Sequence, residues 1–372
     1  MSYQFQFVAE VSPKEDVRSA VPVRSRRWIK IVLALSILIV GGEIVSRAFW
    51  RMYNGTSFFS STPILYSIYP SFRTTGVEDV AIRNNDEVFD VLLLGGSALH
   101  RDYGTIEPQL QEKLARRLGK EVRVYNLAFP AHNTRDSLIK HHRLAGQRFD
   151  LIAIYDGIND ARMNNIPEGE FRDDYSHCRW YDDVNFIERH PALNRLALPF
   201  TLRFAAGRVM EVTGWRGYAS RQKPSAKASE LGKNIRTKKT FKNNIEEIVI
   251  AARARGEKVV LMTYAYHVPE GFSLEGEVDG HPDFASGHSA YATWGKPKYV
   301  TQAIDQHNEA VTELAAKYPG TLLVDQRARM TRAGTHFYDC CHLTATGCAQ
   351  FVDNMLDVIL APGAMGGVSA QP

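Results

Sequence analysis

Residues 89–104 read FDVLLLGGSALHRDYG and contain the turn on which the fold depends. The four consecutive aliphatic residues at 91–94 do not alternate with polar ones, which is typical of a strand buried on both faces of a parallel sheet. Gly95 and Gly96 allow the chain to turn sharply, so Ser97 is predicted at the carboxyl end of that strand. This edge of an α/β sheet is where ligands bind. Taken alone, Ser97 could equally be the N-cap of the next helix.

Around this stretch, predicted strands alternate with predicted helices. Apolar runs predict strands over residues 88–95, 121–129, 149–157, 258–264 and 321–326. Helical periodicity predicts helices over residues 106–120, 134–147, 238–256, 300–320 and 344–360. Because strands that alternate with helices join by right-handed crossovers, we predict an α/β fold. The expected form is a three-layer, flavodoxin-like domain with a five-stranded parallel sheet.

The predicted α/β domain covers residues 86–362. Within it, residues 161–236 lack a strong strand pattern and carry many aromatic residues and several prolines. We therefore expect this segment to be an insertion that forms a cap or a subdomain. Residues 51–85 are expected to connect the domain to the N-terminal region, and residues 363–372 to form a C-terminal tail.

Part of this insertion, residues 191–215, mixes leucines and phenylalanines with Arg195, Arg203 and Arg208. Such a mixture suits a segment on a membrane surface or over the mouth of an active site, with arginines at headgroup height. The alternative is an ordinary cap helix that packs on the core. Exposure of its apolar residues separates the two interpretations.

Residues 28–50, WIKIVLALSILIVGGEIVSRAFW, are expected to form a transmembrane signal anchor. Residues 31–42 carry no charge, and the flanking Lys30 and Glu43 can snorkel, so the stretch reaches the roughly 20 residues that a bilayer requires. Basic residues precede it: Arg24, Arg26, Arg27 and Lys30. This predicts that residues 1–27 are a cytoplasmic tail and that the rest of the chain is extracytoplasmic, either periplasmic or extracellular.

Two alternatives to a membrane anchor stay open. The apolar core is short enough for a signal peptide, with Ser46-Arg47-Ala48 as a weak cleavage site. The run could also be a buried helix of a soluble protein. The 27 residues before the run are long for a secretory leader, which favours an uncleaved, single-pass anchor.

Composition sets few limits on function. The 372 residues carry a net charge of +4, which gives no indication of a nucleic-acid partner. The chain has no zinc-type CxxC pair and no GxxxxGK phosphate loop, and we expect no cofactor. Four histidines are candidate metal ligands: His100, His132, His141 and His142. Their spacing matches no ligand pattern, so no metal site is predicted.

Four loops that follow predicted strands carry polar residues, and all four are expected at the same edge of the sheet. They read GGS at 95–97, NLAFPAHNT at 126–134, YDGINDAR at 155–162 and YDCCHLTATG at 338–347. In this order the loops resemble the four blocks of the SGNH/GDSL serine hydrolase family, and the chain is identified as a membrane-anchored member. Two positions depart from the family pattern. Gly96 replaces the Asp of the family's name motif, and Ala128 stands where the family places Gly.

The resemblance implies a catalytic triad of Ser97, His342 and Asp339. A serine hydroxyl is a poor nucleophile until a base takes its proton, and His342 would be that base, oriented by Asp339. The oxyanion would be held by the N–H groups of Ser97 and Ala128 and by the side-chain amide of Asn159. Simpler roles also exist, because Asp339 could cap the last helix, His342 could pack in its first turn, and Asn159 could form a turn.

The four cysteines leave the redox state open. Cys340 and Cys341 lie between the two downstream triad positions, and a disulfide to Cys178 or Cys348 would brace that loop. Reduced, buried thiols are the alternative.

These observations predict a membrane-anchored extracytoplasmic serine esterase that cleaves O-acyl esters of a glycan or a lipid. One alternative is an O-acyltransferase that uses the same triad to modify a cell-surface polysaccharide. A second is a non-catalytic assembly or binding subunit with the same fold. The acyl group, the alcohol, protein partners and the oligomeric state are beyond this sequence.

Overall fold

The computed structural model describes residues 23–60, 64–74, 76–83, 87–213, 228–269 and 295–364. Its centre is a five-stranded sheet with the order β2-β1-β3-β4-β5, in which every neighbouring pair is parallel. The strands are β1 (Val88–Gly95), β2 (Glu121–Asn126), β3 (Leu151–Tyr155), β4 (Lys258–Met262) and β5 (Leu322–Val324). The predicted α/β fold with a five-stranded parallel sheet is confirmed.

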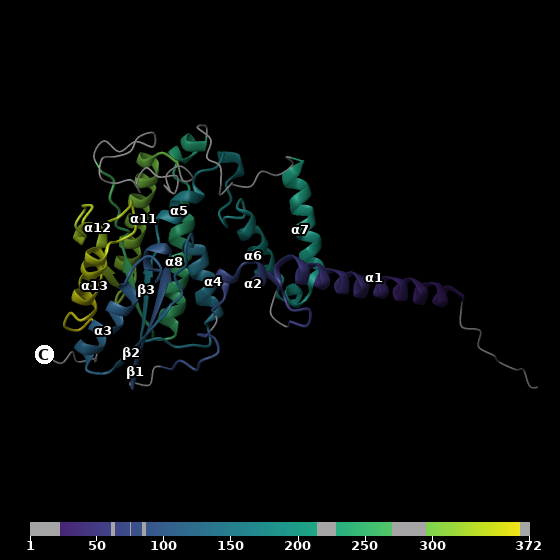
Figure 1. The fold of residues 1–372 in the computed structure, drawn as a ribbon, viewed down its shortest axis with the longest axis horizontal. Coiled ribbons are helices and arrows are strands. Elements are labelled where there is room, and N and C mark those ends of the chain that lie inside the picture. Colours follow the sequence, from purple (N-terminus) through teal and green to yellow (C-terminus); the bar gives the residue numbers. More distant parts are fainter. Residues whose placement is uncertain are drawn as a thin grey trace, which may run out of the picture.

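Helices cover both faces of the sheet (Figure 1). Val91 and Leu93 of β1 pack in one core cluster with α3 (Ile106–Leu118) and α13 (Ala345–Ile359). Leu92 and Leu94 point to the other face. They pack with α4 (Thr134–Arg143), α8 (Thr237–Ala254) and the later turns of α11 (Pro297–Lys317). Every residue from 91 to 94 is fully buried, which explains why the strand is apolar throughout and does not alternate.

Four strands, β2 to β5, end earlier than predicted. For β2 and β5, a side chain at the end of the strand captures the backbone. The side chain of Asn126 accepts a hydrogen bond from the Ala128 amide (3.0 Å), which bends the chain away from β2. Asp325 caps the short helix α12 (Gln326–Arg329) by accepting from the Ala328 amide (3.1 Å), so β5 stops at Val324. Asx and N-cap contacts of this kind compete with strand pairing.

The segment expected as an insertion contains helices and no strand among its described residues. These elements are α6 (Arg179–Arg189), α7 (Ala197–Val212) and the 3-10 turns Glu168–Glu170, Pro191–Arg195 and Ala228–Lys233; the short helix α5 (Ile158–Met163) leads into the segment. Buried residues of α6 and α7 form a third core cluster with Trp50 and with the segment after it, including α2 (Ile64–Ile68) and the turn Pro70–Phe72. The expected connecting region and part of the expected insertion therefore share one core.

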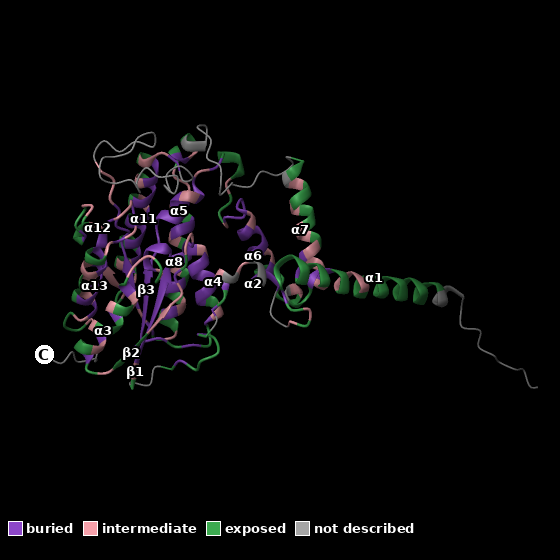
Figure 2. Cartoon of the chain, viewed as in Figure 1, coloured by how far each residue is buried: buried purple, intermediate pink, exposed green. Residues whose placement is uncertain are grey.

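Helix α1 (Val23–Asn54) is continuous and extends away from the α/β layers (Figure 1). Its part from Arg27 to Asn54 is long and apolar enough to cross a membrane, a property that a signal sequence or a core helix can share. The side chains of residues 27–40 are exposed, whereas Ser46 and Trp50 are buried against the rest of the protein (Figure 2).

Candidate active site

The turn at Ser97 depends on two glycines for space rather than for an unusual backbone angle. Gly96 has an extended conformation (φ −91°, ψ −159°). A Cβ on Gly95 would lie 2.5 Å from the Tyr155 carbonyl oxygen, and a Cβ on Gly96 would lie 2.6 Å from Asn159 Nδ2. Ser97 begins the 3-10 turn Ser97–Leu99, of which Gly96 is the N-cap. The serine is thereby held directly beside the third loop.

The fourth loop brings a histidine and an aspartate to this serine. A bridge between Phe337 and Leu343 closes the loop, and the Tyr338 amide donates to the His342 carbonyl (3.1 Å). His342 Nε2 lies 2.7 Å from Ser97 Oγ. On its other side, His342 Nδ1 is hydrogen-bonded to Asp339 Oδ2. Ser97, His342 and Asp339 thus form one continuous hydrogen-bonded line.

Asp339 is held as an acceptor by the backbone that follows it. Its Oδ1 accepts from the amides of Cys341 (2.8 Å) and His342 (2.7 Å). Burial raises the pKa of the Asp339 carboxyl, but hydrogen bonding and charge interaction with His342, together with the two amides, bring it below its ordinary value. An ionised Asp339 would fix the ring tautomer that leaves Nε2 free to accept a proton from Ser97.

The rings of two tyrosines stack on the imidazole. The ring of Tyr103 is stacked on His342 at a centroid distance of 4.6 Å, and the ring of Tyr338 at 5.5 Å. Neither tyrosine stood out in the sequence. Tyr103 belongs to an irregular loop after β1, and His342, on which it stacks, lies more than 200 positions later. Stacking restricts rotation of the imidazole about its side-chain bonds.

The third loop supplies an amide beside the serine. Asn159 lies in the first turn of α5, is buried, and donates through Nδ2 to the His132 carbonyl (2.6 Å). A side-chain amide has two hydrogens on this nitrogen, so one remains for a ligand. The same contact joins the second and third loops next to Gly96.

The second loop has two backbone features that the sequence did not reveal. The Ala128 amide already donates to Asn126. The residue of this loop with a glycine-like backbone is Ala131, whose φ is +65°. The His132 amide donates to the Phe129 carbonyl (3.1 Å), which gives Pro130 and Ala131 the central positions of a tight turn, as in a type II turn. The glycine-like position of this block is therefore Ala131 rather than Ala128, and Pro130 was the signal that could have located it.

Buried carboxylates lie beneath these loops. Asp160 accepts from Thr134 Oγ1 (2.6 Å) and Tyr175 OH (2.9 Å). Asp136 accepts from Tyr181 OH (2.5 Å). Burial raises the pKa of Asp160 to about 7, although hydrogen bonds from Thr134 and Tyr175 act against it. The two tyrosines come from the predicted insertion, so these carboxylates tie it to the loops around Ser97.

The four candidate histidines have separate surroundings. His132 stacks on Phe72 (5.5 Å between centroids), His141 contacts Arg255, and His142 pairs with Glu247 (3.1 Å). The fourth, His100, accepts from the Asp102 amide (3.3 Å).

No disulfide joins the four cysteines, and all of them are buried. Cys341 belongs to a group of potential metal donors with Asp339 and His342, whose atoms lie within 4.8 Å of one another. Both Asp339 oxygens already accept hydrogen bonds, an arrangement that fits an orienting carboxylate.

Comparison with known proteins agrees with this geometry. The model of the GDSL-like lipase/acylhydrolase family matches residues 93–350, which is more than half of the chain. The chain therefore belongs to this family. It is a serine ester hydrolase of the SGNH/GDSL type.

Solved structures with a similar fold share little sequence with this chain. TesA is 16% identical (TM-score 0.39; 73% of this chain and 98% of that chain covered). Axe2, an acetylxylan esterase from Geobacillus stearothermophilus, is 14% identical (TM-score 0.40; 76% of this chain and 97% of that chain covered). The lipase Lip_vut3 from a goat rumen metagenome is 11% identical (TM-score 0.40; 76% of this chain and 98% of that chain covered). With TM-scores below 0.5, we draw no conclusion from these likenesses. No curated protein matches the chain.

Proposed function

We propose that this protein is a membrane-anchored, extracytoplasmic esterase in which Ser97 is the nucleophile. The observation that carries the proposal is the hydrogen-bonded line from Ser97 Oγ through the His342 ring to Asp339. Ser97 Oγ attacks the acyl carbon while its proton passes to His342 Nε2. His342 then gives this proton to the departing alcohol. Water attacks the acyl-enzyme and loses a proton to His342. As the bond between the acyl carbon and Ser97 Oγ breaks, His342 returns a proton to Ser97 Oγ and the acid leaves.

Developing negative charge on the acyl oxygen needs donors close to Ser97. The Ser97 amide and the free hydrogen of Asn159 Nδ2 are the first two candidates. For the third donor we propose an amide of the second loop. The Ala131 turn is favoured over Ala128, because the Ala128 amide is already bonded to Asn126. Loss of one such donor typically lowers the rate by about 100- to 1,000-fold.

The experiment that tests the nucleophile is labelling with a fluorophosphonate probe, together with hydrolysis of p-nitrophenyl acetate. Ser97→Ala should abolish both, because no hydroxyl remains to attack. Ser57→Ala is the matched control, since Ser57 is exposed and lies outside the site. Full labelling of Ser97→Ala would overturn the assignment. A wild type that neither takes the label nor hydrolyses the ester would favour a non-catalytic role.

Contacts of α1 support an uncleaved anchor. Arg47 Nη1 donates to the Phe58 carbonyl (3.0 Å), and its Nη2 donates to the Arg195 carbonyl (2.9 Å). Glu43 accepts from the Ala197 and Leu198 amides (2.9 and 2.8 Å). Cleavage after Ala48 would remove both side chains and leave these groups without their partners. Retention of α1 is therefore favoured by the fold itself.

Topology has its own test. A reporter fused after residue 50 should be active only outside the cytoplasm, because basic residues precede the apolar run. The protein should also resist carbonate extraction and keep its N-terminus. A mature chain that begins at Phe49 would overturn the anchor.

A membrane tether places the site beside lipid esters and beside O-acyl esters of envelope glycans, and we propose one of these as substrate. The same residues would serve an acyltransferase, with a sugar hydroxyl in place of water. Product analysis with a labelled acyl donor separates the two: free acid supports the esterase, and label on a glycan acceptor supports transfer.

A further inference from the structure

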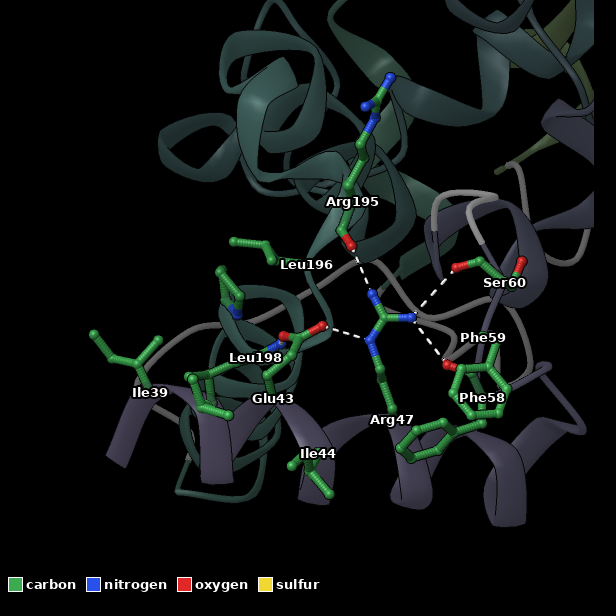
Figure 3. Close-up of a pocket in the computed structure, with 12 residues that line it drawn as sticks. Ile39, Glu43, Ile44, Arg47, Phe58, Phe59, Ser60, Arg195, Leu196 and Leu198 are labelled. Atoms are coloured by element: carbon green, nitrogen blue, oxygen red, sulfur yellow. Dashed lines mark hydrogen bonds and ion pairs between the residues drawn. The ribbon is translucent and has the colours of Figure 1, made fainter. Parts of the chain in front are cut away.

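An apolar recess lies where α1 meets the beginning of α7 (Figure 3). Its volume is about 560 Å³, within the range of about 300–1,000 Å³ typical of small-molecule sites. Its walls include Ile39 and Ile44 of α1, Phe59 of the following turn, Leu196 just before α7, and Leu198 in the first turn of α7. The recess is not part of the site around Ser97, since none of the loop residues described there lines it.

Two of the three charged residues at the recess, Glu43 and Arg47, already have partners within the protein. Arg47 Nε donates to Glu43 Oε1 (2.7 Å), and the other Arg47 nitrogens donate to carbonyl groups. The Glu43 carboxylate accepts the first amides of α7, where a negative charge stabilises a helix. Glu43 and Arg47 therefore fix α7 on α1 and hold the recess open, and the remaining wall offers apolar contacts.

The recess lies at membrane depth if α1 spans the bilayer. At 1.5 Å per residue, Ile39 and Ile44 lie about 17 and 24 Å along the helix from Trp28, and the hydrocarbon core is about 30 Å thick. They would then lie within the acyl chains of the leaflet farther from the N-terminus. Ile39 is 59% exposed and Phe59 is 89% exposed, so the wall continues onto the bare surface of the anchor.

Helix α7 extends this apolar surface sideways. Figure 1 shows α7 crossing the direction of α1, which places it along the membrane plane when α1 is perpendicular to that plane. An apolar stripe on α7 is exposed at helical spacing: Leu202, Ala205, Ala206, Val209 and Val212. At the rim, Arg195 is exposed and points its guanidinium away from the recess (Figure 3), as expected at headgroup height.

We propose that this recess binds an acyl chain of a membrane phospholipid, with the α7 stripe resting in the same leaflet. The inference builds on the proposed membrane anchor. A phospholipid fits because the recess is apolar, opens onto the anchor, and is continuous with the surface that the bilayer would cover. Binding there would hold the catalytic domain at a fixed height and orientation over the membrane.

Photo-crosslinking in the full chain tests this directly. Phe59 is replaced by p-benzoylphenylalanine, the membranes are irradiated, and adducts are identified by mass. Two reference positions receive the same group: Val45, which is 68% exposed on α1 and does not line the recess, and Val80, which is 42% exposed and outside the recess. We expect phospholipid adducts at Phe59 and Val45 and none at Val80.

The reference positions separate failure of the recess from failure of the anchor. Lipid at Val45 but not at Phe59 would overturn the recess and leave the anchor intact. Lipid at neither position would overturn the anchor and, with it, this proposal. A protein adduct at Phe59 in place of lipid would assign the recess to a partner chain and overturn lipid binding.

A second experiment measures occupancy. Native mass spectrometry of the detergent-purified wild type should show a retained phospholipid. Leu196→Trp places a larger side chain in the recess and should lower the lipid-bound fraction several-fold, whereas Leu202→Trp, on the exposed stripe, should leave it unchanged. Equal lipid retention in both variants would overturn the site.

Discussion

At the scale of single residues, Asp339 is the clearest case of a side chain whose role depends on its surroundings. Its two oxygens accept three hydrogen bonds, one of them from the His342 ring. Asp339→Asn would offer an amide where His342 Nδ1–H needs an acceptor. We expect kcat for p-nitrophenyl acetate to fall about 10,000-fold, as for the equivalent change in serine proteases, with the unfolding midpoint nearly unchanged. A loss below about tenfold would contradict the proposed role.

Gly96 is a second residue whose substitution should lower activity, because it packs against the Asn159 amide. A Cβ there would lie 2.6 Å from Asn159 Nδ2 and 3.0 Å from the His132 carbonyl oxygen. Gly96→Ala should push Asn159 away from Ser97 and lower kcat by about 100-fold or more, by loss of one oxyanion donor. Gly169→Ala is the control, because its Cβ would meet no atom within 4 Å. Equal activity of the two variants would show that Asn159 tolerates the methyl group.

At the scale of elements, the contacts of Asp160 with α4 and with Tyr175 should respond to pH. Burial raises the pKa of this carboxyl from 3.8 to about 7. Between these values the folded protein keeps a proton that the unfolded chain releases. The associated stability is complete below pH 3.8 and is lost as the pH rises through 7.

Asp160→Asn keeps an oxygen acceptor but cannot ionise. The free energy of unfolding of the wild type should therefore fall relative to the Asn variant as the pH rises from about 4 to about 7. Denaturant titrations at several pH values measure this difference. Parallel pH profiles for the two proteins would contradict the raised pKa.

Helix α7 divides the two interpretations that the sequence left open for residues 191–215. Phe200 is 2% exposed and packs near Trp50 (5.5 Å between centroids), whereas Leu202 is 62% exposed. One face is thus an ordinary packed face and the other is bare. Phe200→Ala should destabilise the protein by about 3–5 kcal/mol, and Leu202→Ala by less than about 0.5 kcal/mol. Chemical denaturation in detergent checks both, and similar costs would contradict this division.

At the scale of the whole molecule, the C-terminal end of α1 belongs to the core of the domain. Trp50 is fully buried, and its Nε1 donates to Thr201 Oγ1 (2.8 Å). Trp50→Ala in the full chain should cost about 3–5 kcal/mol, because it leaves a cavity between α1 and α7. Met52→Ala, at an 88% exposed position, is the matched control. An unchanged unfolding midpoint for Trp50→Ala would show that α1 and the domain are independent.

The sequence by itself determined the strand–helix alternation, because apolar runs and helical periodicity are local signals. It also determined which loops meet, since parallel strands all end at one edge, and so it named Ser97, Asn159, Asp339 and His342. Only the tertiary structure decided contacts between distant segments. Tyr103 stacks on His342, Ala131 takes the glycine-like position, and Glu43 caps α7. No local pattern encodes these contacts, because each depends on how close two remote segments come after the core has packed.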